Sequence, residues 1–355
     1  MKKGLVLALV IALGLGVALQ KDTIAQRILE AGMNAQMGRN ATAELPDGLH
    51  VGLCGAGGPL PAPNASGPCV VIAAGSQMFV VDAGTDGVRN LIRMGFQPGT
   101  ISAVLLTHFH SDHIDGLGEL ATLRWVNNAN TVPLPVYGAT GVDNIVKGFN
   151  IAYQLDTVYR HAHHGDSVAP LSGAGMLAKS FDKPNEGASL VLIETPDLKI
   201  ETFSVDHSPV DPAVGYKFTY KGRTALITGD TVKSDTIIQH SRNIDLLVHE
   251  ALAPNLINLM HDTAVKKDMA VLANVTSDIL DYHASPMDAA ETAKEAGVKH
   301  LLYYHIVPPL VAPGQAQLFL DGAQDVFNDY TIGQDGVLFS LPAGSSDINL
   351  VKKGL

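Results

Sequence analysis

Three histidines and one aspartate occur within six consecutive positions, in the segment Thr107-His108-Phe109-His110-Ser111-Asp112-His113. Imidazole and carboxylate groups are common ligands of zinc, and they also bind iron and manganese. His108 and His110, two positions apart, can bind one ion, while Asp112 and His113 face a second. The segment therefore predicts a metal site rather than a solvated loop.

The elements around this segment are those that hold active-site residues in α/β folds. An apolar stretch over residues 101–106 predicts a strand before it, and a helix is expected to begin near Gly116. Catalytic side chains in such folds gather at the carboxyl ends of strands. Asp82 ends another apolar run beside Gly84, so it can hydrogen-bond to the metal-binding segment, or it is an ordinary turn aspartate.

The second half of the chain repeats the arrangement of an apolar strand with a polar side chain at its end. These strand ends carry Val205-Asp206-His207, Gly229-Asp230-Thr231, His249-Glu250 and Tyr304-His305. A helical stretch is expected from about residue 254 to 281, and His283 follows it. The next helix has Ser285 as its N-cap, Pro286 at its first position and Gly297 after its end.

The remaining pattern alternates helices with two batches of strands, which predicts two packed sheets with helices outside. A second histidine cluster, His161-Ala-His-His164-Gly-Asp166, lies in an expected polar loop. It is interpreted as a pocket rim or solvated loop rather than a metal site. Helices are expected over 87–95, 116–126 and 142–160, and paired strands over 188–195 and 198–205.

Together these motifs resemble the metallo-β-lactamase superfamily, and within it the ribonuclease Z and arylsulfatase-like branch. The His-x-His-x-Asp-His signature is complete at 108–113, and the resemblance covers about residues 49–340. It implies an α/β fold, an αββα four-layer sandwich with a dinuclear metal centre between its sheets. The other matching pieces are Gly55-Ala-Gly-Gly-Pro59, Asp206-His207 followed by Pro212-Ala-Val-Gly-Tyr216, Gly229-Asp230-Thr231 and His249-Glu250-Ala251.

The resemblance also implies a role for each site residue. His108, His110 and His207 would bind the first metal ion. Asp112, His113 and His305 would bind the second, with Asp230 bridging the two. The cofactor is expected to be two Zn²⁺, with iron or manganese also compatible, and the ions would lower the pKa of a bridging water that attacks the ester.

Proton transfer is expected from Glu250 and His283, which join Asp112 as the predicted catalytic residues. The branch usually reads His-Ser-Thr where this chain has His283-Ala-Ser, so a core histidine is the alternative there. His249 is expected to support the site from outside the ligand set.

Charge and motif spacing bear on the substrate. The net charge of −11 over 355 residues argues against a nucleic-acid surface, which should be basic. Bacterial ribonuclease Z-like enzymes carry a tRNA-clamping arm between the ligand His and the bridging Asp, but only 22 residues separate His207 from Asp230. The prediction is a hydrolase of a small phosphodiester or sulfate ester, with nucleic acid disfavoured. Lactone or β-lactam hydrolysis, tRNA 3′ processing and non-catalytic metal binding are the alternatives, and a homodimer follows from the resemblance only.

The N-terminus predicts export. Lys2 and Lys3 precede an uncharged, mostly apolar stretch over residues 4–19, which as a helix reaches ~24 Å against a ~30 Å hydrocarbon core. Residues 1–19 are thus predicted to be a signal peptide or a membrane anchor, and the protein is expected to be periplasmic or anchored in the inner membrane facing the periplasm. The rest of the chain is predicted to comprise a helical stalk over 20–47, a hydrolase domain over 48–345 and a C-terminal tail over 346–355.

The two cysteines, Cys54 and Cys69, lie near the start of the predicted hydrolase domain. In an exported protein they can form a disulfide that closes a loop rich in glycine and proline. Two unpaired core thiols are the alternative.

Overall fold

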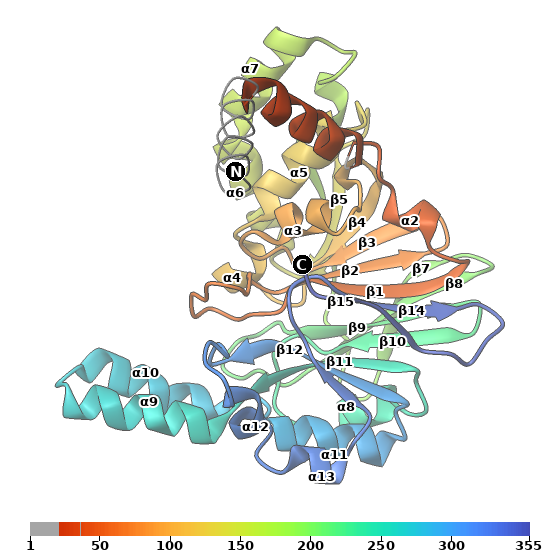
Figure 1. Ribbon diagram of the computed structural model, residues 1–355. Coiled ribbons are helices and arrows are strands. Elements are labelled where there is room, and N and C mark those ends of the chain that lie inside the picture. Colours follow the sequence, from red (N-terminus) through yellow and green to blue (C-terminus); the bar gives the residue numbers. More distant parts are fainter. Residues whose placement is uncertain (1–20, 36) are drawn as a thin grey trace, which may run out of the picture. The chain divides into compact units, whose positions relative to one another are not determined.

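The computed structural model describes residues 21–35 and 37–355 (Figure 1). The chain divides after Asn40 into two units, and the larger unit is Ala41–Leu355. In the smaller unit, residues 21–35 are helical. The predicted export segment over residues 1–19 lies outside the described residues. Among the residues that are described, no helix is long and apolar enough to cross a membrane.

The larger unit contains two β-sheets, and the first has eight strands in the order β15-β14-β1-β2-β3-β4-β5-β6. β1, β2 and β3 pair antiparallel, whereas β3 to β6 run parallel. The metal-binding segment directly follows β4, at the carboxyl end of a parallel strand. The strands are β1 (Gly48–Gly55), β2 (Cys69–Ala74), β3 (Gln77–Val81), β4 (Ile101–Leu105), β5 (Leu134–Ala139), β6 (Met176–Phe181), β14 (Val337–Pro342) and β15 (Asn349–Lys353).

The second sheet has seven strands in the order β13-β12-β11-β10-β9-β8-β7. β10 to β13 run parallel, so the carboxyl ends of β10, β11 and β12 meet at one edge of the sheet. The strand pair predicted over 188–195 and 198–205 is confirmed as antiparallel β7 and β8. The strands are β7 (Ser189–Glu194), β8 (Leu198–Ser204), β9 (Val214–Tyr220), β10 (Arg223–Ile227), β11 (Leu246–Leu252), β12 (His300–Val307) and β13 (Tyr330–Ile332).

Helices cover the outer faces of both sheets, which confirms the predicted αββα sandwich (Figure 1). On the side of the eight-stranded sheet are α2 (Ala41–Glu44), α3 (Gly87–Arg93), η1 (Pro98–Thr100), α4 (Ser111–Ile114), α5 (Leu117–Val126), α6 (Val142–Ala152), α7 (Gln154–His164) and η2 (Leu171–Gly173). With the seven-stranded sheet are α8 (Asp235–His240), α9 (Pro254–Lys266), α10 (Ala270–Asp278), η3 (Ile279–Asp281), α11 (Pro286–Ala296), α12 (Gln315–Leu320) and α13 (Ala323–Val326).

Alternation along β11 shows how the layers are built. Leu246 and Val248 lie in the core between the two sheets. Leu247 and Ala251 lie on the opposite face and pack with Ala289 of α11. Because successive side chains of a strand point to opposite faces, one buried strand serves both layers.

Two helical predictions need correction. The helix expected over 142–160 is broken at Tyr153 into α6 and α7, because the Tyr153 ring packs against Gly118 of α5, where a Cβ would lie 2.2 Å from it. The second segment, α7, continues beyond residue 160, so His161–His164 form its last turn rather than a polar loop. The stretch over 254–281 is two helices, α9 and α10, because Asp268 turns the chain with a φ of 54°.

Other local predictions are confirmed. Ser285 caps α11 by accepting a hydrogen bond from the backbone N–H of Asp288, and Gly297 ends the helix with a φ of 66°. Cys54 and Cys69 form a disulfide between the end of β1 and the start of β2, the first of the two interpretations. The C-terminal tail expected over residues 346–355 needs correction, because it includes β15, which pairs with β14 in the eight-stranded sheet.

A buried ion pair links the start of β10 to the residue that precedes the neighbouring strand β11. The Asp245 carboxylate accepts hydrogen bonds from Arg223 Nε at 3.1 Å, from the Thr224 N–H at 2.8 Å and from Lys299 Nζ at 2.7 Å. Burial raises the pKa of Asp245, but the hydrogen bonds from Arg223 and Lys299 outweigh burial and hold the pKa below its ordinary value.

The Asp245→Asn substitution is expected to lower the free energy of unfolding by about 3–5 kcal/mol, because it leaves the buried Arg223 guanidinium without its counter-charge. Since the folded-state pKa of Asp245 is depressed, its contribution is present above the unfolded pKa of about 3.9 and is lost as the pH falls below it. Urea unfolding at pH 7 and pH 3 measures both effects. A difference between the two proteins that is equal at the two pH values would contradict this account.

Candidate metal centre

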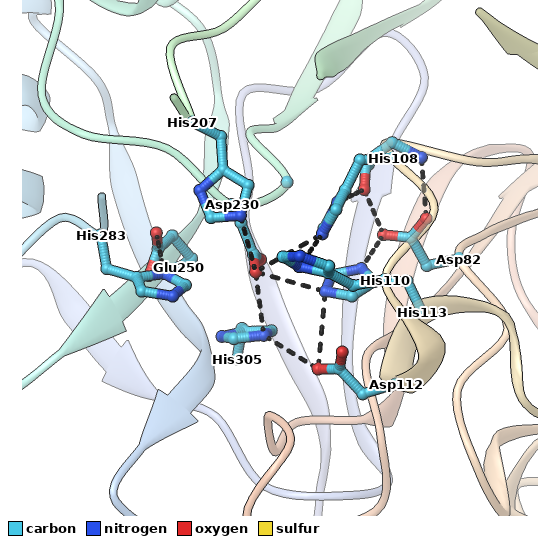
Figure 2. Close-up of polar contacts among 12 residues, drawn as sticks. Asp82, His108, His110, Asp112, His113, His207, Asp230, Glu250, His283 and His305 are labelled. Atoms are coloured by element: carbon cyan, nitrogen blue, oxygen red, sulfur yellow. Dashed lines mark hydrogen bonds and ion pairs between the residues drawn. The ribbon is translucent and has the colours of Figure 1, made fainter. Parts of the chain in front are cut away.

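The structure brings all seven predicted metal ligands together between the two sheets (Figure 2). His108 and His110 follow β4, and Asp112 and His113 lie in the short helix α4. The seven-stranded sheet supplies the other three from the ends of β8, β10 and β12. They are His207, Asp230 and His305.

The Asp230 carboxylate lies at the middle of the cluster. Its Oδ2 is 3.2 Å from His305 Nε2, 3.4 Å from His113 Nε2 and 3.9 Å from both His108 Nε2 and His207 Nε2. Ligand atoms on one tetrahedral zinc ion stand about 3.3 Å apart. One oxygen at these distances from four imidazole nitrogens suits a carboxylate shared by two ions.

The predicted ligands form two groups around Asp230, and His283 forms a further group with Asp230 and His305. Within each group the possible ligand atoms all lie within 4.8 Å of one another. The first group is His108, His110, His207 and Asp230, and the second is Asp112, His113 and His305. This is the division expected for two ions.

Several donor atoms lack any hydrogen-bond partner although they are buried, which is a test of whether metal ions fit here. They are Asp112 Oδ2, His113 Nε2, His207 Nε2 and His305 Nε2. Buried polar atoms without partners are costly and rare. Imidazole nitrogens and carboxylate oxygens converging on one space suit zinc, iron or manganese, and such ions would satisfy these atoms.

Burial and charge shift the imidazole pKa values of the cluster in opposite directions, because burial is outweighed at His113 and His305 by the negative charge of Asp230, which raises the pKa of both. Burial lowers the pKa of His108 well below its ordinary value and also lowers the pKa of His207. Burial raises the pKa of Asp230, but the charges of His305 and His113 outweigh it and hold the pKa well below its ordinary value. Neutral imidazoles and an ionised carboxylate are the forms that bind metal.

Asp82 holds the metal-binding segment in place, as the sequence suggested. It accepts hydrogen bonds from the Thr107 N–H, from the Thr107 hydroxyl and from His113 Nδ1, each at 2.8 Å. His113 Nε2 is thereby left to face the cluster. The Thr107 hydroxyl lies 3.1 Å from His108 Nδ1, so it fixes that ring in the same way.

Two supporting groups were not assigned a role from the sequence. The Thr107 hydroxyl is one, and the Tyr282 carbonyl, which accepts a hydrogen bond from His207 Nδ1 at 2.8 Å, is the other. A backbone carbonyl leaves no mark in a sequence pattern, whereas Thr107 stood beside the histidines and could have been considered.

His305 is held in an unusual backbone conformation, with a φ of 45°. The register between β11 and β12 shifts at this point, where Glu250 pairs with Tyr304 but Ala251 pairs with Ile306. His305 is therefore the extra residue of the bulge. Gly58, from the predicted glycine and proline loop, packs so closely that a Cβ would lie 2.9 Å from the His305 ring.

Glu250 and His283 form a buried pair beside the cluster. His283 Nδ1 donates to Glu250 Oε1 at 2.8 Å, and the same oxygen accepts from the Thr231 N–H at 2.9 Å. Burial lowers the pKa of His283, but the charge of Glu250 and its hydrogen bond outweigh burial and raise it to about 9. The His283 ring lies 5.1 Å from that of His207 and 5.7 Å from that of His305, between centroids.

Two further histidine predictions concern residues outside the ligand set. His249 belongs to none of the donor groups among the described residues and contacts the backbone of Glu250 instead. Its Nδ1 donates to the Glu250 carbonyl at 2.8 Å, and the charge of Asp288 in α11 acts on it. The histidines of α7, interpreted as a pocket rim or solvated loop rather than a metal site, lie on an exposed helix end and join no metal-binding group among the described residues.

Comparison with known proteins gives a consistent result. The family model of the metallo-beta-lactamase superfamily matches residues 63–305. A protein named Ribonuclease Z from Mycobacterium bovis (strain BCG / Pasteur 1173P2) is 34% identical over 271 residues, which are 76% of this chain and 89% of that protein. Another Ribonuclease Z, from Mycolicibacterium paratuberculosis (strain ATCC BAA-968 / K-10), is 33% identical over 291 residues, 81% of this chain and 96% of that protein.

Solved structures share the fold at lower identity. The short form of human tRNase Z has a TM-score of 0.59 and 21% identity, with 82% of this chain and 99% of that chain covered. The metallo-beta-lactamase fold protein YhfI from Bacillus subtilis has a TM-score of 0.57 and 22% identity, with the same coverage.

Proposed function

The chain belongs to the metallo-beta-lactamase superfamily, as a metal-dependent hydrolase of the ribonuclease Z-like branch, and from this we propose that it uses two zinc ions to hydrolyse a small anionic ester, either a phosphodiester or a sulfate ester. The observation that carries the proposal is the pair of donor groups around Asp230 with the His283–Glu250 pair beside them. Ligands alone would also suit a structural metal site, whereas a hydrogen-bonded histidine and glutamate next to the ligands suit proton transfer.

The metal ions and the residues beside them would have different roles in the reaction. When bound, two divalent ions supply Lewis acidity and an activated water. Glu250 accepts a hydrogen bond from His283 Nδ1–H, which orients the ring, and the charge of the carboxylate favours the protonated form of His283. A protonated His283 can donate its other proton to the leaving oxygen.

The segment between His207 and Asp230 supports a small substrate. After a short loop it consists of the antiparallel strands β9 and β10, which belong to the seven-stranded sheet. It is therefore too short to contain the tRNA-clamping arm that bacterial ribonuclease Z-like enzymes carry at this position.

RNA is the second candidate substrate, and the relatives' names favour it. Proteins named Ribonuclease Z are up to 34% identical to this chain across most of their length, as reported above. The prediction that nucleic acid is disfavoured therefore finds no support in these relatives and rests on the net charge and the short segment before Asp230.

Export is part of the proposal and rests on the sequence of residues 1–19, with Lys2 and Lys3 ahead of the apolar stretch. A periplasmic location, or one on the periplasmic face of the inner membrane, would supply the oxidising surroundings in which the disulfide between Cys54 and Cys69 persists. The homodimer stays a proposal from the family resemblance.

The zinc-loaded protein is tested on bis(p-nitrophenyl) phosphate, p-nitrophenyl sulfate and a tRNA precursor with a 3′ trailer, with His110→Ala as the blank. We expect release of p-nitrophenol from the phosphodiester or the sulfate at a rate well above the blank. Cleavage of the RNA alone would replace the small-ester proposal with RNA processing. Rates equal to the blank on all three would point to lactones or to a non-catalytic metal protein.

A further inference from the structure

The helices α9 and α10 form a hairpin that projects from the larger unit, on the side of the seven-stranded sheet (Figure 1). Its base is anchored in a small apolar cluster, where Ile257 packs with Leu252 and Val307, and Leu60 packs against them. Beyond the base, Ala264 and Ala273 are buried on the two helices. The hairpin is thus a stable arm whose outer end is free.

The tip of the hairpin, defined here as residues 265–271, is exposed at every position. Its three large apolar side chains are exposed, with 54% of Val265, 48% of Met269 and 79% of Val271 accessible to solvent. Single exposed apolar residues are ordinary, but a group of them at the end of a projecting arm marks an interaction site.

The tip is ordered by its own backbone. The Met269 N–H donates to the Ala264 carbonyl at 2.9 Å, and the Asp268 N–H donates to the Val265 carbonyl at 3.1 Å. These hydrogen bonds hold the turn at Asp268, so the apolar side chains are presented outward without any partner to order them.

We propose that this tip inserts into the surface of an anionic lipid bilayer. Val265, Met269 and Val271 would enter the boundary of the hydrocarbon region. Lys266 and Lys267, exposed between them, would lie among the lipid phosphates. The two lysines outnumber Asp268, the single acidic residue of the tip, so exposed apolar side chains and a net positive charge occur together, as binding to an anionic bilayer surface requires.

Two further observations favour lipid over a protein partner. A stable protein interface takes about 20–30 residues from each side, whereas the tip has seven. The N-terminus repeats the same chemistry, since Lys2 and Lys3 precede the apolar stretch over residues 4–19. The membrane contact proposed for the tip does not depend on the ester that the metal centre hydrolyses.

The test uses the full chain with an environment-sensitive NBD label on Val271→Cys, and on Val132→Cys as the matched control. Val132 is also an exposed valine, but it lies in the loop before β5. Vesicles of phosphatidylglycerol and phosphatidylcholine should raise the fluorescence of the tip label several-fold with a blue shift, and brominated lipids should quench it. The control label should change by less than a tenth of that amount.

Charge reversal of the tip provides the second measurement. Lys266→Glu combined with Lys267→Glu should weaken the vesicle response of the tip label about tenfold or more, because each lysine near an anionic surface contributes to binding. Vesicles that sediment with the chain but leave the tip label unchanged would overturn the proposal and assign binding to another segment. A blue shift that follows protein concentration without vesicles would overturn it in favour of a second copy of the chain.

Discussion

The Asp230→Ala substitution is expected to reduce kcat/KM by at least about 10³-fold and to empty both metal positions. The reason is that one carboxylate oxygen lies within 3.9 Å of four imidazole nitrogens from both donor groups. Without it, neither ion keeps a full ligand set, and the chemistry that the ions supply is lost. Turnover of the active nitrophenyl ester, with metal content per chain measured by mass spectrometry, gives both quantities.

The matched control is Asp156→Asn, which breaks an exposed ion pair with Arg160 on α7. Exposed pairs contribute little to stability, so this variant should keep its metal and its rate. If Asp230→Ala retained two ions per chain, the assignment of Asp230 as the bridging residue would be wrong.

The His283→Ala substitution is expected to lower kcat by about 10²–10⁴-fold while both ions stay bound. His283 is engaged by Glu250 through Nδ1 and is the proposed donor to the leaving oxygen. A good leaving group such as p-nitrophenolate needs little proton donation, whereas an alkoxide needs much. The loss should therefore be larger for an alkyl ester than for the nitrophenyl ester of the same acid.

Glu250→Gln should show the same dependence on the leaving group with a smaller loss, because it keeps a hydrogen-bond acceptor but removes the charge that favours protonated His283. His163→Ala, on the exposed end of α7, serves as the control and should leave the rate unchanged. Equal losses for both leaving groups would sink the proton-donor role and leave His283 as a residue that only positions others.

The site was largely predictable because its chemistry is concentrated where strands end. Four ligands lie within six residues, and His207, Asp230 and His305 each follow or end an apolar run. What could not be predicted depends on tertiary packing. The Tyr282 carbonyl, which accepts a hydrogen bond from His207 Nδ1, is an example, because the fold brings it to the site and no side-chain pattern marks it.

The fold was predictable to a similar degree and for similar reasons. Ser285, Pro286 and Gly297 mark both ends of α11 by local chemistry. The break at Tyr153 has no such mark, since it depends on the contact of that ring with Gly118 of another helix. The turn at Asp268 was missed because an aspartate, rather than a glycine, adopts the left-handed conformation there.

The origin of the ligands in both sheets has a consequence beyond catalysis. The eight-stranded sheet supplies His108, His110, Asp112 and His113, and the seven-stranded sheet supplies the remaining three ligands. Ions bound among them would cross-link the two β-sheets, which are the middle layers of the sandwich. By mass action, each tenfold rise in free metal above the dissociation constant of one site would add about 1.4 kcal/mol to the folded state. The concentration of free metal in the compartment would thus affect the stability of the folded protein as well as its rate of catalysis.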